Sequence, residues 1–218
     1  ETLLNRLTQA GCPVTVVRPG AAFERAEDGS YTVQVGSRED YTALLSELSK
    51  SDRGPDVIAH LWGVSDGDAV EDIADRGFYS VLALAQAVSD RGSDAAVDLL
   101  VVSNGVHDVS GVDPLVPEKA LVLGPCRVAP QEIAPLSCQH VDIALPHTPA
   151  TVDALLAEVH AAADDRDVAL RGGYRWVQEF APLPLDAPGD DDPRVRQGGT
   201  YLITCLLYTS DAADELLG

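Results

Sequence analysis

Residues 97–103 read VDLLVVS and are followed directly by Asn104-Gly105. A short apolar run that ends at such a turn signal is typical of a buried β-strand. Upstream, residues 68–91 carry apolar side chains at helical spacing, and residues 56–62 (DVIAHLW) form another run, apolar enough to predict a central strand. This alternation of strand, helix and strand predicts an α/β protein with a mostly parallel sheet flanked by helices.

The N-terminal part adds two shorter strands and a helix. Residues 13–17 (PVTVV) predict a first strand that stops at Pro19-Gly20. Residues 30–35 predict a second strand, which we expect to be peripheral because it alternates in polarity. Ser37 is a suitable N-cap for a following helix, since acidic residues in the first turn favour the helix dipole. One face of that helix carries Tyr41, Leu44, Leu45 and Leu48.

Residues 117–132 look helical but contain Pro125 and Pro130. Because each proline removes a backbone donor and collides with the preceding turn, we expect a kinked or broken helix. The remaining pattern predicts a strand at 138–143, a helix at 151–163, and two strands at 168–171 and 174–180 around Gly172-Gly173.

The 218 residues include 35 acids and 15 bases, which gives a net charge of −20. Such a surface repels phosphate backbones and anionic lipids, so we expect neither a nucleic-acid nor a membrane partner. No apolar run approaches membrane-spanning length, and the start of the chain lacks a signal-peptide layout. Four cysteines without a C-x-x-C motif predict a reduced, cytoplasmic protein. The chain contains no Met, even at position 1, so we expect it to begin inside a longer reading frame.

Composition divides the chain into segments. We expect residues 1–181 to form the globular domain and residues 182–197 to form a linker rich in Pro and Asp, in which 190–192 act as a solubilising spacer. Residues 198–204 (GGTYLIT) predict a new strand with nothing behind it to complete the unit, and residues 205–218 form a tail.

Few residues are candidates for chemistry. The five histidines, at positions 60, 107, 140, 147 and 160, contain no i, i+4 pair, so zinc ligation is not expected. His60 is suited to a structural role beside Trp62, and Cys126 to that of an inert buried thiol. Ser103 to His107 follow a buried strand at the place where α/β sheets carry ligands, so they are kept as an alternative enzyme site.

Two absences argue against a cofactor or reductase site in this chain. No G-x-G-x-x-G loop follows any complete strand, so nucleotide binding has no support. Short-chain reductases need a tyrosine four residues before a lysine, but Ser46 and Leu115 stand four residues before the two lysines, Lys50 and Lys119. We therefore assign no catalytic, cofactor-binding or metal-binding residue.

Seven stretches, in order along the chain, carry a family resemblance: residues 4–23 (LNRLTQAGCPVTVVRPGAAF), 39–45 (EDYTALL), 55–62 (PDVIAHLW), 77–88 (GFYSVLALAQAV), 98–105 (DLLVVSNG), 118–131 (EKALVLGPCRVAPQ) and 198–204 (GGTYLIT). Together they resemble a type I modular polyketide synthase, in the structural, N-terminal half of its ketoreductase domain. The resemblance implies a truncated Rossmann-like half that binds no cofactor. It would pack on a catalytic half that holds NADPH and reduces a β-ketoacyl thioester carried by an acyl carrier protein.

In that family GGTYLIT opens the catalytic half and runs into a glycine-rich phosphate loop. Thr204 matches the last residue before that loop, but residues 205–208 (CLLY) contain no glycine. Glycines let backbone amides approach a pyrophosphate, so this departure implies that the cofactor site is lost. Residues 205–215 (CLLYTSDAADE) resemble translated sequencing-adapter read-through.

The resemblance therefore predicts a non-catalytic scaffold half that is inactive alone and has no cofactor of its own. Its partners would be the missing catalytic half and, in the parent synthase, the acyl carrier protein and the other domains. Two other interpretations stay open. The chain could be a free-standing α/β interaction module, or an unrelated small α/β enzyme with its site at Ser103 to His107.

Overall fold

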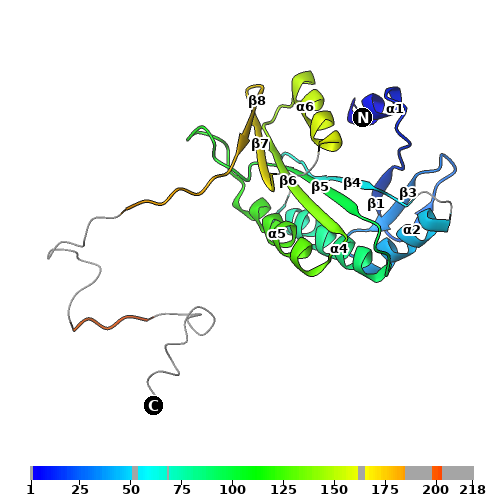
Figure 1. Cartoon of the computed structure of the whole chain (residues 1–218), viewed down its shortest axis with the longest axis horizontal. Coiled ribbons are helices and arrows are strands. Elements are labelled where there is room, and N and C mark those ends of the chain that lie inside the picture. The colour runs from blue at the N-terminus through cyan, green and yellow to red at the C-terminus, as the bar shows by residue number, and fades with distance from the viewer. Residues whose placement is uncertain (1, 51–53, 68, 162–164, 185–197, 203–218) are drawn as a thin grey trace, which may run out of the picture. The chain divides into compact units, whose positions relative to one another are not determined.

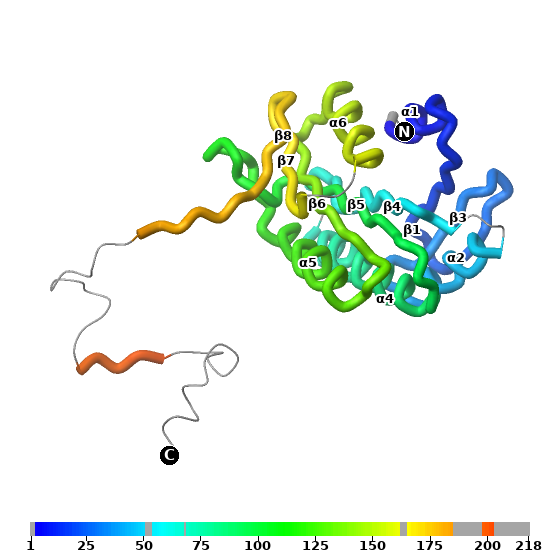
Figure 2. Tube along the Cα trace, in the orientation of Figure 1, coloured from blue at the N-terminus to red at the C-terminus, as the bar shows by residue number. Residues whose placement is uncertain are grey.

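The computed structural model describes residues 2–50, 54–67, 69–161, 165–184 and 198–202. The chain divides into two compact units, residues 1–179 and residues 180–218. The first unit is an α/β fold, drawn as a cartoon in Figure 1 and as a trace in Figure 2. No described helix is both long enough and apolar enough to cross a membrane.

The second unit is described only at residues 180–184 and 198–202, which form neither helix nor strand. Over residues 198–202 the backbone forms no strand ladder, so the strand expected at 198–204 is not formed there. The rest of that expected strand, the tail at 205–218 and most of the expected linker lie outside the described residues.

A five-stranded sheet forms the centre of the first unit. Its order is β4-β5-β6-β7-β8, in which β4 to β7 are parallel and β8 is antiparallel to β7. The predicted α/β architecture with a mostly parallel sheet is thus confirmed. The strands are β4 (Val57–Gly63), β5 (Val97–Asn104), β6 (Leu136–Ile143), β7 (Asp167–Arg171) and β8 (Tyr174–Val177).

Strands β5 and β6 are the buried middle of this sheet. They pair along their whole lengths, from Val97 opposite Leu136 to Asn104 opposite Ile143. Each has a strand on both sides and helices on both faces, so every residue of β6 except Ser137 is buried. The predicted strands at 97–103 and 138–143 are confirmed.

Helices cover both faces of the sheet (Figure 1). On one face, α4 and α5 pack over a hydrophobic cluster that includes Leu99 and Val101. On the other face, α6 packs over a second cluster that includes Leu100 and Val102. The three helices are α4 (Ser80–Asp90), α5 (Leu123–Glu132) and α6 (Pro149–His160).

The placement of α6 reverses the hand of one connection. The connections β4–α4–β5, β5–α5–β6 and β6–α6–β7 all advance in the same direction along the sheet. Because α6 lies on the face opposite to α4 and α5, the third connection has the opposite hand to the first two.

A separate three-stranded sheet lies in the N-terminal part, with order β1-β3-β2. Two expectations for this region are wrong. The first strand starts at Val17 and contains Pro19 and Gly20, which a strand at the edge of a sheet tolerates because a missing N–H there breaks no ladder. The strand expected to be peripheral is the middle one, with Tyr31 and Val33 buried. The strands are β1 (Val17–Gly20), β2 (Glu24–Arg25) and β3 (Tyr31–Gln34).

The helix predicted after Ser37 is α2 (Arg38–Lys50). The Ser37 hydroxyl accepts a hydrogen bond from the Asp40 N–H at 3.2 Å, as an N-cap does. The four apolar residues expected on one face, Tyr41, Leu44, Leu45 and Leu48, are all buried.

The expectation that residues 56–62 form a central strand is wrong, because β4 is the edge of the five-stranded sheet. Val57 and Leu61 on this strand are 39% and 38% exposed. An apolar run indicates that the faces of a strand are covered, but it does not indicate whether both of its edges are paired.

The helix predicted at 68–91 is a continuous rod of α3 (Val70–Ala74), a π-helical turn η1 (Asp75–Tyr79) and α4. The helix predicted at 117–132 is divided, but between Val122 and Leu123 and not at Pro125 or Pro130: a 3₁₀ segment η2 (Pro117–Val122) passes into α5, and Pro130 lies inside α5. Pro125 lies in the first turn of α5, where the missing N–H has no partner to lose.

The C-terminal strands pair as predicted around Gly172 and Gly173, whose φ angles of 56° and 82° are those of a tight hairpin turn. Strand β8 ends at Val177, earlier than expected. Helix α6 begins with Pro149 and is capped by Thr148, and α1 (Thr2–Gln9) contacts it.

Candidate functional site

Four side chains form one row across the five-stranded sheet. His60 on β4 pairs with Val101 on β5, Val101 pairs with His140 on β6, and His140 pairs with Asp167 on β7. Paired residues of parallel strands point to the same face. The row therefore lies on the face covered by α4 and α5, where Val101 joins the core.

His140 is the centre of a buried polar cluster at one end of this row. Its side chain is fully buried, and its Nε2 shares a 2.7 Å hydrogen bond with the Ser103 hydroxyl. Its Nδ1 has no hydrogen-bond partner and lies 3.8 Å from Asp167 Oδ1. The His107 ring stands edge-on to it, with ring centres 5.5 Å apart. Burial lowers the pKa of His140 to about 4, although the Asp142 carboxylate acts in the opposite direction.

A second set of charges lies beside His140. Asp142, which is fully buried, accepts a hydrogen bond from Arg171 Nη2 at 2.5 Å and hydrogen bonds from the N–H groups of Val106 and His107. Arg171 Nε also donates to Asp113 Oδ1 at 2.8 Å. These bonds tie the loop that follows β5 to the adjacent strands β6 and β7.

The same contacts shift the pKa values of the charged groups. The backbone and hydroxyl donors of Ser110 hold the pKa of Asp113 well below its usual range, with further help from the Val109 N–H and Arg171. Burial lowers the pKa of Arg171, but the hydrogen bond and charge of Asp142 more than offset this and raise it. Both groups are therefore charged at neutral pH.

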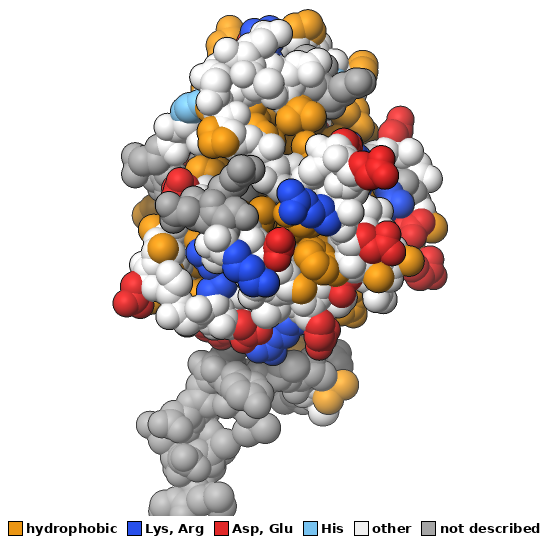
Figure 3. All heavy atoms as spheres, turned by 90° about the vertical axis from the view of Figure 1, so that its right-hand side faces the viewer, with side chains coloured by type: hydrophobic (Ala, Val, Ile, Leu, Met, Phe, Trp, Pro, Cys, Tyr) orange, Lys and Arg blue, Asp and Glu red, His pale blue; other side chains and the backbone are white. Residues whose placement is uncertain are grey.

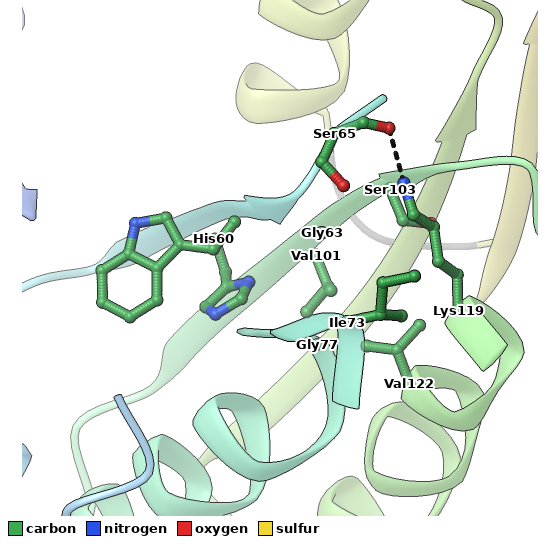
Figure 4. A pocket seen from close by; sticks show the side chains of 10 residues that line it. His60, Gly63, Ser65, Ile73, Gly77, Val101, Ser103, Lys119 and Val122 are labelled. Carbon is green, nitrogen blue, oxygen red and sulfur yellow. Dashed lines mark hydrogen bonds between the residues drawn. The ribbon is translucent and has the colours of Figure 1, made fainter. Parts of the chain in front are cut away.

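Lys119 in η2 contacts the carboxyl ends of β4 and β5. It is almost fully buried, and its ammonium group donates to Asn104 Oδ1 at 2.7 Å. It also donates to the Ser65 carbonyl at 2.8 Å (Figure 4). Asn104 Oδ1 also accepts from the Ser65 N–H at 3.0 Å. The cavity between His60, Ser103 and Lys119 has a volume of about 10 Å³, room for one water molecule at most.

A larger hollow of about 550 Å³ opens at the carboxyl ends of the parallel strands. Ligands of open α/β sheets bind at this edge, in pockets of roughly 300–1,000 Å³. Of its charged lining groups, Asp113, Lys119 and Arg171 are already engaged with protein partners, and Asp66 is a further one. The other lining residues include Ser65, Gly105, Ile143, Leu145, Pro146 and His147.

The geometry does not favour the alternative enzyme site at Ser103 to His107. Ser103, His140 and Asp167 lie in the serine–histidine–aspartate order of a nucleophilic triad, and the His107 ring lies beside His140. However, Ser103 is 1% exposed, so a substrate carbonyl has no access to its hydroxyl. The 3.8 Å between His140 and Asp167 also exceeds a hydrogen bond.

The sequence analysis missed His140, Asp142, Asp167 and Arg171 as members of this cluster. The sequence did contain a signal for His140 and Asp142. The predicted strand 138–143 contains the polar residues Gln139, His140 and Asp142, which are unusual in a buried strand. No local pattern marks Asp167 or Arg171, which join through strand pairing.

The other candidates lie apart from the cluster or outside the described residues. His60 is buried beside Trp62, with ring centres 5.3 Å apart, which agrees with the structural role predicted for it. Cys126 is buried, and a hydrogen bond with Cys138 together with burial raises the pKa of its thiol, so the thiol is protonated and inert. Residues 190–192 and 205–208 are not described. That the chain holds no catalytic, cofactor-binding or metal-binding residue stays a prediction.

The fold and its sheet edge define a Rossmann-like α/β protein. The family described as "Beta-ketoacyl synthase-like, N-terminal" matches residues 1–159, and the chain belongs to that family. No curated protein sequence matches the chain.

Solved ketoreductases share this fold. An N-terminal ketoreductase of the macrolactin assembly line is 19% identical, with a TM-score of 0.65, over 86% of this chain and 40% of that one. The first ketoreductase of the tylosin synthase is 20% identical, with a TM-score of 0.60, over 80% and 34%. A keto acid-selecting NRPS module with adenylation and ketoreductase domains is 23% identical, with a TM-score of 0.74, over 83% and 16%. The chain thus spans less than half the length of these proteins.

Proposed function

We propose that this chain is the structural, non-catalytic half of a polyketide synthase ketoreductase. In this proposal residues 1–181 form the scaffold, residues 182–197 are the linker, and residues 198–204 begin the catalytic half. That half would bind NADPH and reduce a β-ketoacyl thioester on an acyl carrier protein. The other synthase domains would be further partners, and the parent would work in the cytoplasm, where the buried thiols of Cys126 and Cys138 stay reduced.

One observation carries the proposal. Five solved ketoreductases match 74–86% of this chain but only 34–42% of their own lengths. This coverage supports a chain that corresponds to a fraction of a larger reductase. The family match over residues 1–159 supports the same placement.

The sheet edge of this chain does not suit a dinucleotide. The loop after β4 contains one glycine among residues 64–67. The glycine after β5, Gly105, has a φ of 74°, and a Cβ there would lie 2.9 Å from the Pro114 carbonyl oxygen. Gly105 thus lets the following loop pack closely against Pro114, a use of glycine that differs from the approach to a pyrophosphate. We expect NADPH to bind the missing half and not this chain.

The exposed surface also suits a protein that works inside an assembly without nucleic acid. On the face seen in Figure 3, acidic, basic and hydrophobic side chains are interspersed and form no broad basic patch. This agrees with the net charge of −20.

The test is complementation with a separately expressed catalytic half from the same reading frame. The full chain alone should show no saturable NADPH fluorescence change and no reduction of a small β-ketoacyl thioester. Addition of the chain to the catalytic half should raise NADPH oxidation and raise the Tm of the mixture, because a partner that binds only folded protein stabilises it. Equal rates and an unchanged Tm at saturating chain would contradict the proposal, and so would a Kd for NADPH of about 1 mM or tighter on the chain alone.

A further inference from the structure

Three potential metal ligands converge at the polar end of the row. His107 comes from the loop after β5, His140 from β6 and Asp167 from β7, and one ligand atom of each lies within 4.8 Å of the others. Three atoms that are no more than 4.8 Å apart have a common point within about 2.8 Å of each, where a metal ion could sit. Zinc bonds to nitrogen and oxygen are about 2.0–2.2 Å, so an inward shift of roughly 0.7 Å per ligand would complete them.

Two of these side chains have a buried nitrogen without a partner. His107 Nε2 and His140 Nδ1 are both shielded from solvent and make no hydrogen bond. Buried polar atoms in folded proteins are nearly always paired, and an unpaired one calls for an explanation such as a bound ion. Here two such atoms belong to the same three-residue cluster.

The atoms that face away from this point are already oriented. His140 Nε2 shares a hydrogen bond with the Ser103 hydroxyl. In the Nε2–H tautomer the hydroxyl accepts this bond and Nδ1 carries the lone pair that a metal ion needs. Asp167 Oδ2 accepts hydrogen bonds from Arg127 at 2.9 and 3.2 Å, which leaves Oδ1 facing His140. Outer hydrogen bonds of this kind fix the ligands of metal sites in proteins.

We propose that His107, His140 and Asp167 bind one divalent transition-metal ion, with zinc the best match to two imidazoles and a carboxylate. The ion would fasten the loop after β5 to β6 and β7. The charge nearby permits it, since among the described residues the carboxylates of Asp113, Asp142 and Asp167 form ion pairs with two guanidinium groups, Arg127 and Arg171. This departs from the sequence-based prediction of no metal ligand, which considered only spacing along the chain.

The test uses the full, untagged chain after removal of metal with EDTA. Titration with Co²⁺ should give one ion per chain with the visible absorption bands of four-coordinate cobalt. Zn²⁺ should displace it and raise the Tm, while Mg²⁺ should not, because Mg²⁺ prefers oxygen ligands. An absence of Co²⁺ and Zn²⁺ binding by the chain would overturn the proposal.

Variants locate the site. His107→Ala should weaken Zn²⁺ binding by more than about 100-fold, because it removes a direct ligand, whereas loss of an outer-shell partner alone weakens binding by about 10–100-fold. His107→Gln serves if His107→Ala does not melt cooperatively. The matched controls are His147→Ala and His160→Ala. His147 is exposed, and the His160 ring lies 4.0 Å from the Cys12 sulfur. Both variants should bind Zn²⁺ as the unsubstituted chain does. Unchanged binding in the His107 variants, loss in the controls, or a thiolate-to-cobalt absorption band would each assign the ion elsewhere and overturn the proposal.

Discussion

His60 and His140 lie in the same row of the sheet, separated by Val101, yet they belong to two different environments. Each is buried, each bonds a serine hydroxyl through Nε2, at 2.8 Å for Ser80 and 2.7 Å for Ser103, and each has an unpartnered Nδ1. Burial lowers the pKa of both to about 4.

The difference is in what surrounds the two rings. His60 lies against the Trp62 ring, and burial accounts for its pKa. His140 lies among Asp142, Asp167 and His107, whose charges and ring nitrogens converge on it. A buried histidine with a serine partner is therefore not by itself a site. The strands and loops that flank it decide whether it is one.

The largest effect on stability should come from removing a buried carboxylate beside His140. Asp142→Ala leaves the Arg171 guanidinium without its buried carboxylate and the Val106 and His107 N–H groups without an acceptor. Arg171 keeps its ion pair with Asp113, but removal of one partner of a buried ion pair is strongly destabilising, so the free energy of unfolding should fall by about 3–5 kcal/mol, measured by urea denaturation.

The matched control is Asp153→Ala, which removes the exposed ion pair with Arg6 at 3.1 Å. An exposed pair of this kind contributes less than about 1 kcal/mol. Similar losses in the two variants would mean that the cluster around Asp142 is as solvated as the protein surface.

A smaller effect on stability is expected from His60 when the pH is lowered. The pKa of His60 is about 4 in the folded chain against 6.5 when exposed, so below pH 6.5 the unfolded chain binds a proton that the folded chain does not. Stability should therefore fall as the pH drops from 6.5 to 4, by about 3 kcal/mol from this group.

His60→Phe isolates that contribution. The phenyl ring can stay against Trp62, and the Ser80 hydroxyl keeps its bond to the Arg76 carbonyl at 2.5 Å. Urea denaturation at pH 7 and pH 4 should show that, between these two pH values, the variant loses about 3 kcal/mol less of its free energy of unfolding than the unsubstituted chain does. Equal acid losses would show that His60 is solvated in the folded state.

The smallest effect is expected at Tyr41, which neighbours Trp62 with ring centres 6.5 Å apart. Its hydroxyl is buried without a hydrogen-bond partner, and burial raises the pKa of this phenol. Since removal of an unpaired buried hydroxyl returns its desolvation penalty, Tyr41→Phe should be neutral or stabilise by about 1 kcal/mol, measured as a shift in Tm. A clear loss of stability would reveal a partner for the hydroxyl.

The sequence predicted the elements whose character is local. The strand at 97–103 and the helix after Ser37 follow from side-chain periodicity and capping within a few residues. The division of residues 117–132 was also predicted, but it lies before both prolines and not at them. The errors concern neighbours. The edge position of β4 and the middle position of β3 depend on which strands pair, and an apolar run contains no record of that.

The candidate site divides in the same way. The segment from Ser103 to His107 was kept as an alternative enzyme site because a turn after a buried strand is visible in the sequence. His140 and Asp167 join them only because β5, β6 and β7 pair in one register, which places residues far apart in the chain at one level on one face. The α/β class and the order of its elements could thus be predicted from the residues alone, because helix and strand periods are properties of neighbouring residues. The tertiary structure alone decided the polar cluster, since strand register and the choice of face arise only when separate segments bury their side chains together.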